Sequence, residues 1–353
     1  MRTTATMLSC LALLSCTKEQ GRWGDTFITD EILPEFCDSK TEIVEIGYDS
    51  IYETECYVYH DSVLIQFDIK HSGLYFFNIS LLKDDHCIAQ YFKRGEGPNE
   101  LLNPYVNGLE ENRLKICDLA TDRKGFIDID SAIAYGNRYT PKIYHNPDKG
   151  QGECWPNDTV CVTVNGQYIE GFGLDGIKEF VAYDVKNEKP LIDSKENTKC
   201  FPFNVTGGDI VYNREKKRFF YCYMRRPRYA ILDSMLTFTK KVVGPDPDDG
   251  SFHIEEDGEV WHDGEMDDYF FDPACTQKYI IACNTRLYKT SYTDEEAAKR
   301  AEVYLINWDG EIVARRKMNC LPLSLSYSDE TRTLYYTAMD EEGERKLYRC
   351  RLE

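Results

Sequence analysis

The sequence predicts an all-β fold: a six-bladed β-propeller with four-stranded antiparallel blades, whose ring is closed by an N-terminal strand. The composition favours strands, with 25 Tyr and 17 Phe among 353 residues. Six pairs of short apolar runs, each pair joined by a polar break, recur at intervals of about forty to fifty residues, which is the repeat length of a propeller. An unpaired strand-like run near the N-terminus supplies a way to complete the last blade.

The six pairs are interpreted as the second and third strands of successive blades. In chain order they are Ser62–Phe67 with Leu74–Ile79, Leu114–Leu119 with Gly125–Ile129, Gln167–Phe172 with Phe180–Tyr183, Phe219–Met224 with Tyr229–Leu232, Tyr279–Thr285 with Val303–Ile306, and Leu334–Tyr336 with Lys346–Cys350. An inner strand precedes each pair, as at Pro104–Glu110, and an outer strand follows, as at Cys87–Lys93 and Glu311–Lys317.

Two short patterns complete this prediction. Asn307 to Gly310 contains Asp-Gly, a strong hairpin signal, and is expected to join two strands of the fifth blade. No further run follows the sixth pair, and Thr41–Ile46 alternates like a strand without a partner of its own, so it is expected to close the ring as the missing outer strand. One helix is predicted, at Thr293–Ala301, because Thr293 to Glu296 form a capping box.

The order of strands also predicts which face carries function. In an antiparallel meander, the links between second and third strands and the links between blades leave on one face. The long connections Arg94–Asn103, Asn146–Asn157, Gly244–Asp268 and Ser291–Ala301 are all links of these two kinds. Loops on a rigid scaffold commonly carry binding residues, so we expect the site on this loop-rich face, over the mouth of the channel.

The stretch from Gln90 to Pro104 is a Gly-rich turn between two strands. Four polar residues flank it and are candidate ligand-binding residues: Arg94, Glu96, Asn99 and Glu100. The alternative is structural, since the Glu100 carboxylate can accept hydrogen bonds from exposed backbone N–H groups of the turn.

A family resemblance rests on the same stretch. The pattern Gly95-x-Gly97-Pro98-x-Glu100-Leu101-x-x-Pro104, followed by Leu114 to Asp118 and by Arg123-x-x-Phe126, resembles an NHL-type repeat, and most of all the repeat of the TolB-like six-bladed propeller lipoproteins of Bacteroidetes. The resemblance implies a propeller fold and a place in the cell envelope. It implies no reaction and no ligand.

The N-terminus predicts export and lipid anchoring. Arg2 precedes an apolar run from Ala5 to Leu14, and Leu13-Leu14-Ser15-Cys16 resembles a bacterial lipobox. We therefore expect a signal peptide over residues 1–15, a tether over 16–30 that is lipidated at Cys16, and the propeller over 31–353. The expected location is the outer membrane, facing either the periplasm or the cell surface. The alternative is an ordinary signal peptide with an incidental cysteine.

The charge excludes one class of partner and raises a possible cofactor. A net charge of −19 argues against nucleic acid, which needs a basic surface. Gly244–Asp268 holds eleven acidic residues and no Lys or Arg, and such oxygen donors suit calcium. The spacing fails the EF-hand pattern, so a solvated acidic loop is the other interpretation and no cofactor is the default expectation.

Other candidate binding residues lie in or beside the same loops. Arg225, Arg226 and Arg228 offer guanidinium groups for a carboxylate or sulfate, or else compensate the acidic loop. Trp261 and His262, with Trp155 and Tyr269 nearby, would stack on a sugar ring if exposed and would belong to the core if buried.

The cysteines and histidines give no metal site. Cys117, Cys222 and Cys283 occupy one register of the same strand in three repeats and are interpreted as small buried hydrophobes, since residues so placed lie too far apart to bridge. Cys154 with Cys161 and Cys275 with Cys283 stay open as local disulfides. The six histidines show no ligand spacing.

Three functions are compatible with these patterns. The first is a lipid-anchored binding module for a small molecule, glycan or protein. The alternative is a hydrolase or lyase that uses loop carboxylates, with calcium as a possible cofactor, although no catalytic residue can be named. The third is a structural component of an envelope complex.

Overall fold

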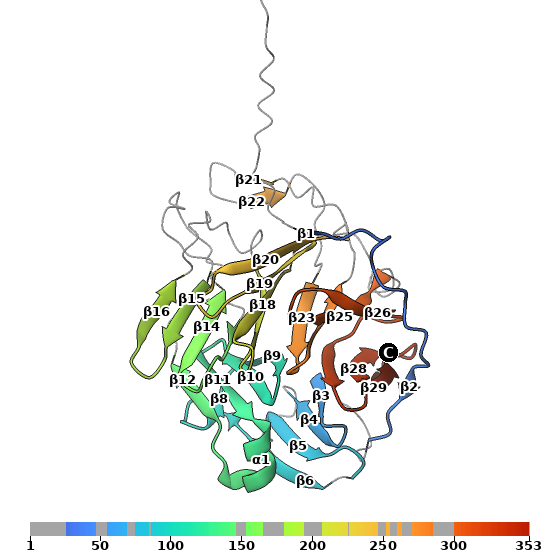
Figure 1. Ribbon diagram of the computed structural model, residues 1–353. Coiled ribbons are helices and arrows are strands. Elements are labelled where there is room, and N and C mark those ends of the chain that lie inside the picture. The colour runs from blue at the N-terminus through green and yellow to red at the C-terminus, as the bar shows by residue number, and fades with distance from the viewer. Residues whose placement is uncertain are drawn as a thin grey trace, which may run out of the picture.

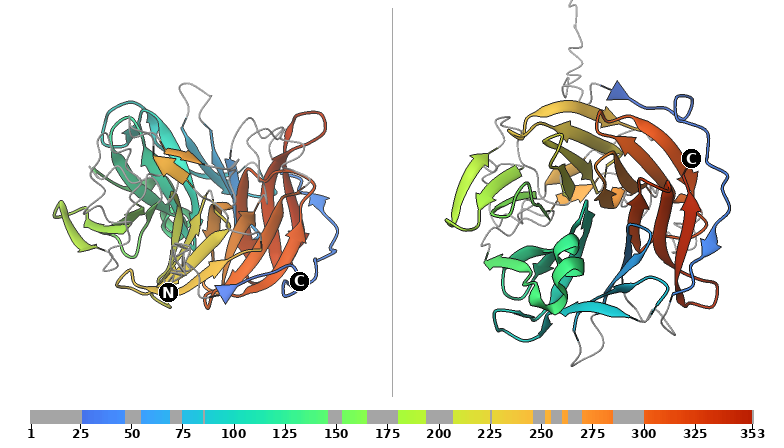
Figure 2. Two further views of the ribbon diagram at one scale, coloured as in Figure 1. Left: turned by 90° about the horizontal axis from the view of Figure 1, so that it is seen from above. Right: turned by 60° about the horizontal axis from the view of Figure 1, so that its bottom comes forward.

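The fold is all-β and propeller-like (Figure 1). The computed structural model describes residues 26–46, 55–68, 75–84, 86–145, 153–164, 180–193, 207–224, 226–245, 252–254, 260–262, 270–284 and 300–352. Figure 2 shows the sheets arranged around a common centre, with the N-terminal segment running along the outside.

Two sheets are meanders of four consecutive antiparallel strands. One consists of β3 (Glu55–Tyr59), β4 (Val63–Phe67), β5 (Phe77–Leu81) and β6 (Cys87–Tyr91). The other consists of β13 (Glu153–Cys154), β14 (Val160–Val164), β15 (Phe180–Asp184) and β16 (Lys189–Asp193).

Two further sheets gain a strand from the N-terminal segment. The strands β17 (Gly208–Asn213), β18 (Arg218–Tyr223), β19 (Arg228–Leu232) and β20 (Phe238–Val243) are joined by β1 (Thr26–Phe27), which runs parallel to β20. The strands β27 (Ser324–Ser328), β28 (Thr333–Met339) and β29 (Arg345–Arg351) are joined by β2 (Glu42–Ile43), which is antiparallel to β29.

The largest sheet has eight strands and differs from the expected separate blades. It combines β9 (Pro104–Glu110), β10 (Arg113–Asp118), β11 (Arg123–Asp128) and β12 (Lys142–His145) with β23 (Phe270–Cys275), β24 (Tyr279–Asn284), β25 (Glu302–Asn307) and β26 (Ile312–Lys317).

The two halves of this sheet meet at one parallel pair, Cys275 with Glu110. A Cβ at Gly108, where φ is +86°, would lie only 3.4 Å from the carbonyl oxygen of Pro273, so the inner strands approach closely. The described strands therefore form five separate sheets of four or more strands rather than six.

Short elements fill the connections. The pairs β7 (Lys93–Arg94) with β8 (Glu100–Leu101) and β21 (Phe252–Ile254) with β22 (Val260–His262) are two-stranded. Helix α1 (Ile129–Tyr135) and the 3-10 turn η1 (Gly136–Arg138) join β11 to β12.

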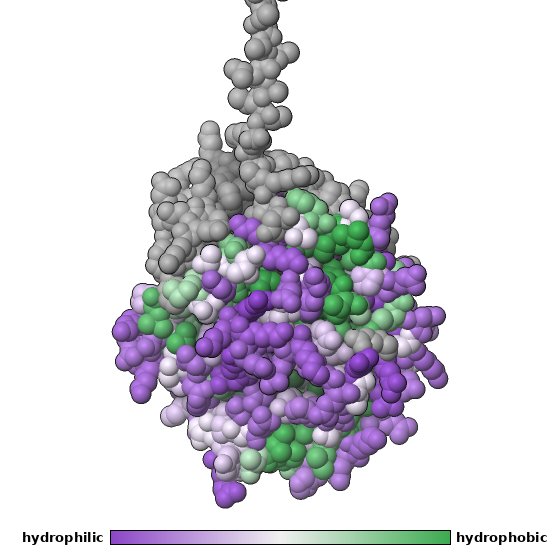
Figure 3. All heavy atoms as spheres, in the orientation of Figure 1, coloured by the Kyte–Doolittle hydropathy of each residue, from purple (hydrophilic) through white to green (hydrophobic). Residues whose placement is uncertain are grey.

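The N-terminal segment ties three sheets together along their outer edges. Between β1 and β2, Phe36 forms a parallel bridge with Arg315 of β26. The Arg315 Nε atom donates to the carbonyl oxygen of Pro34 at 2.6 Å, and its guanidinium lies 3.9 Å from the centre of the Phe36 ring. Several large apolar side chains of this segment are exposed: Phe27, Ile32, Phe36 and Ile43. Figure 3 shows a mainly hydrophilic surface on which hydrophobic residues gather in separate patches.

The core confirms the interpretation of three cysteines. Cys117, Cys222 and Cys283 each occupy the fifth position of a six-residue second strand, and all three are buried. Burial raises the pKa of the Cys117 thiol to about 12. Neither local disulfide forms, because Cys154 and Cys275 are free thiols.

Several strand predictions match the structure and others need correction. Pro104–Glu110 is β9 with the expected bounds, and Asn307–Gly310 joins β25 to β26. The second strand of the third repeat is Val160–Val164 instead of Gln167–Phe172, which lies outside the described residues. The described helix is α1, which the sequence did not predict, and the predicted helix at Thr293–Ala301 lies almost entirely outside the described residues.

The two faces of this propeller-like arrangement carry different connections. Figure 1 places β21 and β22, which link one unit of four strands to the next, at the top, and α1, which links a third strand to a fourth, at the bottom. The short turns that follow the inner strands lie on the same side as α1, because they share its parity in the meander.

Candidate functional site

A pocket of about 550 Å³ lies where the inner strands end. Its lining comes from the ends of β3, β9, β23 and β27, the turn after β17, and the start of α1. Segments far apart in the sequence therefore converge on one face of the propeller-like fold. The polar residues that matter below are His60, Glu111, Asn112, Asp130, Arg214 and Asp329. This is the face opposite the one on which the long connections were expected to carry the site.

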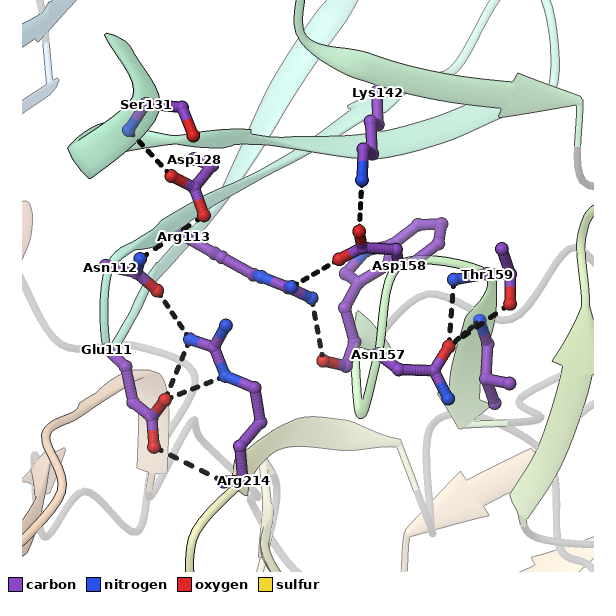
Figure 4. A network of polar contacts seen from close by, with 12 residues as sticks. Glu111, Asn112, Arg113, Asp128, Ser131, Lys142, Asn157, Asp158, Thr159 and Arg214 are labelled. Carbon is purple, nitrogen blue, oxygen red and sulfur yellow. Dashed lines mark hydrogen bonds and ion pairs between the residues drawn. The ribbon is translucent and has the colours of Figure 1, made fainter. Parts of the chain in front are cut away.

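One wall is a hydrogen-bonded network centred on Asn112 (Figure 4). The Arg214 guanidinium donates from Nε to Glu111 Oε2 at 2.8 Å, and its Nη2 atom donates to Asn112 Oδ1 at 2.6 Å. In turn, Asn112 Nδ2 donates to Asp130 Oδ2 at 2.8 Å and to Asp128 Oδ2 at 3.2 Å. A chain of charge-assisted hydrogen bonds thus fixes the guanidinium relative to the carboxylates.

Helix α1 places Asp130 on this wall. Asp128 is its N-cap and accepts from the backbone N–H of Ser131 at 2.8 Å, which positions Asp130 in the first turn. The hydroxyl of Tyr59 donates to Asp130 Oδ1 at 2.8 Å. Burial, reinforced by this hydrogen bond to Asp130, raises the pKa of Tyr59, so the phenol stays protonated and remains a donor.

A second wall is the turn between β3 and β4, which presents His60. Both His60 and Asp61 adopt left-handed backbone conformations, with φ of 47° and 55°, and such conformations cost energy in non-glycine residues. The Asp61 carboxylate holds the turn in place by accepting hydrogen bonds from Ser328, Thr331 and Tyr335 at 2.6, 2.9 and 2.7 Å. The ring of His60 lies edge-on to Tyr59, with 4.1 Å between the centroids.

The third wall comes from the turns after β23 and β27. Thr276 Oγ1 donates to Asp329 Oδ1 at 2.9 Å, which links the two turns. Burial raises the pKa of the Asp329 carboxyl, although the bond from Thr276 and the charge of Lys278 oppose the shift.

Two buried charged residues, close in sequence to the lining of the pocket, join the inner strands. Glu110, at the end of β9, accepts from the backbone N–H of Trp155 at 3.3 Å and from that of Tyr212 at 3.2 Å. Lys115 Nζ donates to the carbonyl oxygens of Glu153 and Ile210 at 2.9 and 3.2 Å. Burial raises the pKa of Glu110, while Lys115 lowers it. These side chains join neighbouring inner strands through satisfied polar groups.

Behind the Asn112 wall, a buried arginine supports the turn. Arg113 Nη2 pairs with Asp158 Oδ1 at 2.6 Å, and its guanidinium stacks 4.1 Å from the centre of the Phe126 ring. Lys142 also binds Asp158. Figure 4 shows Arg113, Asp158 and Lys142 beside the Arg214 network.

In the predicted Gly-rich turn, Glu100 has a structural role, because its carboxylate holds the backbone of the turn. Its carboxylate accepts from the backbone N–H of Gly97 at 2.9 Å. Arg123 donates to the carbonyl oxygens of Gly97 and Glu100 at 3.1 and 2.6 Å. Burial alone would raise the pKa of Asp118, but hydrogen bonds from the backbone N–H groups of Asn103 and Leu102 hold it below its usual range. The motif residues thus fasten the turn to β10.

All four flanking residues of that turn lie away from the pocket at the ends of the inner strands. Arg94 is exposed in β7, and Glu96 is exposed as well. Asn99 and Glu100 line a second pocket of about 380 Å³, beside Tyr75 and Tyr139. None of these four residues lines the pocket at the ends of the inner strands.

The remaining predicted residues lie in other parts of the fold or outside the described residues. Arg226 is buried, and Arg228 begins β19, whereas Arg225 lies outside the described residues. Trp155 belongs to the core, with its ring 5.3 Å from that of Phe126. Backbone positions alone are described for Trp261 and His262, in β22. All eleven acidic residues of Gly244–Asp268, Cys16 and Tyr269 also fall outside the described residues, so calcium binding and lipidation stay predictions.

The described residues contain no group of three or more His, Cys, Asp or Glu arranged to hold a metal ion. Their helices include none long and apolar enough to cross a membrane.

Solved structures share the fold. A member of the DUF4221 family from Bacteroides vulgatus superposes with a TM-score of 0.55 at 11% identity, over 90% of this chain and 96% of that one. A protein from Bacteroides fragilis described as exported superposes with a TM-score of 0.52 at 10% identity, over 93% of this chain and all of the other. No family profile matches the sequence, and no curated protein matches it. At these identities the similarity shows the fold alone.

The sequence did not predict the pocket residues, because they lie in short turns that carry no recognisable motif. Glu111, with φ of 51°, and His60 are non-glycine residues in left-handed turn conformations, which sequence does not reveal. One signal was available: polar residues recur at the first turn of several repeats, as in His60-Asp61, Glu111-Asn112 and Asp329-Glu330. Comparing equivalent turns between repeats would have brought them together.

Proposed function

We propose that this protein is a lipid-anchored binding module of the cell envelope, and that it binds a small polar ligand in the pocket at the ends of the inner strands. The observation that carries the proposal is the convergence of fixed polar side chains from several sheets on one concave site of about 550 Å³, a size typical of ligand pockets. Such convergence is expected of a site on a rigid scaffold, because the turns are held by the strands beneath them.

The proposal includes a six-bladed ring. The eight-stranded sheet divides into two units of four at the single pair of Cys275 with Glu110, and this division would give six blades in all. Closure would come from β2 on β29. The Asp61 hydrogen bonds between the first and last units support this arrangement.

Anchoring at Cys16 would orient the pocket away from the membrane. The segment enters at β1, which pairs with the last residues of β20, and β20 ends on the face opposite α1. A lipid ahead of β1 would therefore hold the loop-rich face near the bilayer and leave the pocket open to the periplasm or the cell exterior. The exported neighbour from Bacteroides fragilis, of the same fold, is compatible with this location. Membership of the TolB-like propeller lipoproteins would be compatible with the same location.

The test is a thermal-shift screen of the full-length protein in detergent against sugars, amino acids, nucleotides and polyamines. We expect at least one compound to raise the melting temperature of the wild type but not of Asp130→Asn, because a ligand stabilises the state that binds it. The matched control is Asp122→Asn, an exposed carboxylate in the turn between β10 and β11 on the opposite face. If every stabilising compound acts equally on wild type and Asp130→Asn, the pocket is not the binding site.

A hydrolase is the second candidate, and Asp329 favours it. A carboxyl whose pKa is raised by burial, placed in a concave pocket, suits a general acid. Release of methanol from methyl glycosides by the wild type but not by Asp329→Asn would establish this activity, because an alkoxide leaves only when an acid donates a proton to it.

A further inference from the structure

The pocket at the ends of the inner strands offers both fixed donors and fixed acceptors. The Nη1 atom of Arg214 makes no hydrogen bond within the described part of the chain, while Nε and Nη2 are held by Glu111 and Asn112. Each oxygen of Asp130 accepts one hydrogen bond, which leaves acceptor capacity on the carboxylate. The amide of Asn112 bridges the two groups, so the donor and the acceptor lie two hydrogen bonds apart.

This pairing selects among ligand classes. An ammonium group has donors only and leaves Arg214 unmatched, whereas a carboxylate or a fully ionised phosphate group has acceptors only and leaves Asp130 unmatched. A hydroxyl both donates and accepts, and two neighbouring hydroxyls satisfy Arg214 and Asp130 together. Groups left unmatched in a partly buried site cost affinity.

The charges of the residues that line the pocket also favour an uncharged ligand. The acidic residues Glu111, Asp130, Asp329 and Glu330 outnumber the cations Arg214 and Lys278 by two, and the whole chain carries −19. An anionic ligand is repelled by this field. Since Arg214 and Glu111 neutralise each other at 2.7 Å, the site does not require a charged ligand.

The pocket also has an apolar side. Val58 and Leu109 line it, and the exposed His60 ring stands at its rim on a turn that Asp61 holds rigid. A pyranose has vicinal hydroxyls at its edge and a face of C–H groups. Its edge suits the Asn112 wall, and its face suits the His60 ring.

Resting on the proposed function, we propose that the ligand is the uncharged, polyhydroxylated end of a carbohydrate. Asp130 and Arg214 bind neighbouring hydroxyls, and His60 covers one face of the sugar.

The test measures binding by ligand-observed NMR with three classes of probe: methyl glycosides of neutral hexoses, spermidine, and inorganic phosphate. The full-length protein in detergent is compared with Asp130→Asn, His60→Gly and the control Asp122→Asn. Glycine suits the φ of 47° at position 60, so His60→Gly removes the ring without straining the turn. Circular dichroism verifies folding of each variant.

We expect a neutral glycoside to bind with little dependence on salt. Asp130→Asn should weaken binding by about tenfold or more, because it removes a charged acceptor. His60→Gly should weaken it less, and Asp122→Asn should leave it unchanged. A glycoside that binds all variants equally overturns the inference. If only spermidine or phosphate binds in a manner that depends on Asp130, the carbohydrate inference fails while the pocket remains the binding site.

Discussion

The hydroxyl of Tyr335, in β28, donates a 2.7 Å hydrogen bond to Asp61 Oδ1, in the turn after β3. The two residues belong to the last and first four-stranded units of the chain and are 274 positions apart. The same carboxylate accepts from Ser328 and Thr331, so one side chain fastens the two ends of the fold beside the pocket.

We expect Asp61→Ala to lower the free energy of unfolding by about 2–4 kcal/mol, because it leaves partly buried hydroxyls without an acceptor and places Ala at positive φ. Urea denaturation followed by circular dichroism measures the change. Asp122→Ala is the control, since Asp122 also has positive φ, 51°, but accepts no side-chain hydrogen bond within the described part of the chain. Equal losses in the two variants would mean that the hydrogen bonds contribute nothing.

Gly95 and Glu100 form a second testable pair. A Cβ at Gly95 would lie 2.0 Å from Glu100 Oε2, so Gly95→Ala must displace the carboxylate from the Gly97 N–H. We expect a loss of about 1–3 kcal/mol of stability for Gly95→Ala, and a smaller loss when it is introduced into Glu100→Ala, because the clashing atoms are then absent. A double-mutant cycle from urea denaturation measures the coupling. Additive effects would contradict this role of Glu100.

The strands were predictable because their signal is local. Runs such as Pro104–Glu110 are bounded by turn residues and are rich in apolar residues that pack on both faces of a sheet, and their order alone gives the meanders. Equivalent positions also carry over between repeats, which is why Cys117, Cys222 and Cys283 were correctly placed in the core.

The site was not predictable because its signal is global. Glu111 and Arg214 are 103 positions apart, and only the arrangement of the sheets around a common centre brings their turns together. Helix α1 was missed because it is a single short element whose N-cap, Asp128, directly continues a strand. The long loops led to the prediction of a site on the other face, whereas the converging side chains lie in the short turns.

The thiols provide a test of the core. We expect iodoacetamide to modify Cys87, which is exposed, while Cys117 and Cys154 stay unmodified in the folded protein, because burial excludes the reagent and raises the pKa of both thiols. Peptide mass spectrometry after labelling, with and without urea, measures this. Labelling of Cys154 at the rate of Cys87 without urea would show that the inner strands open in the native state.

Glu153 makes the stability depend on pH. Both carboxylate oxygens are buried, and the nearest cation is Lys124 Nζ at 3.9 Å from Oε2. Burial raises the pKa of Glu153 to about 7 from an ordinary 4.5, against the charges of Lys124 and Lys115. The folded protein therefore holds the proton more tightly than the unfolded chain. The resulting stabilisation is complete below pH 4.5 and is lost as the pH rises through about 7.

From this group alone, the free energy of unfolding should fall by about 3 kcal/mol between pH 4.5 and pH 8. Glu153→Gln should reduce the pH dependence without abolishing it, because burial also raises the pKa of Glu55 to about 7. Urea denaturation across this pH range measures the slope, with Glu330→Gln, an exposed carboxyl, as the control. A slope that Glu153→Gln leaves unchanged would mean that this carboxylate is solvated in the folded protein.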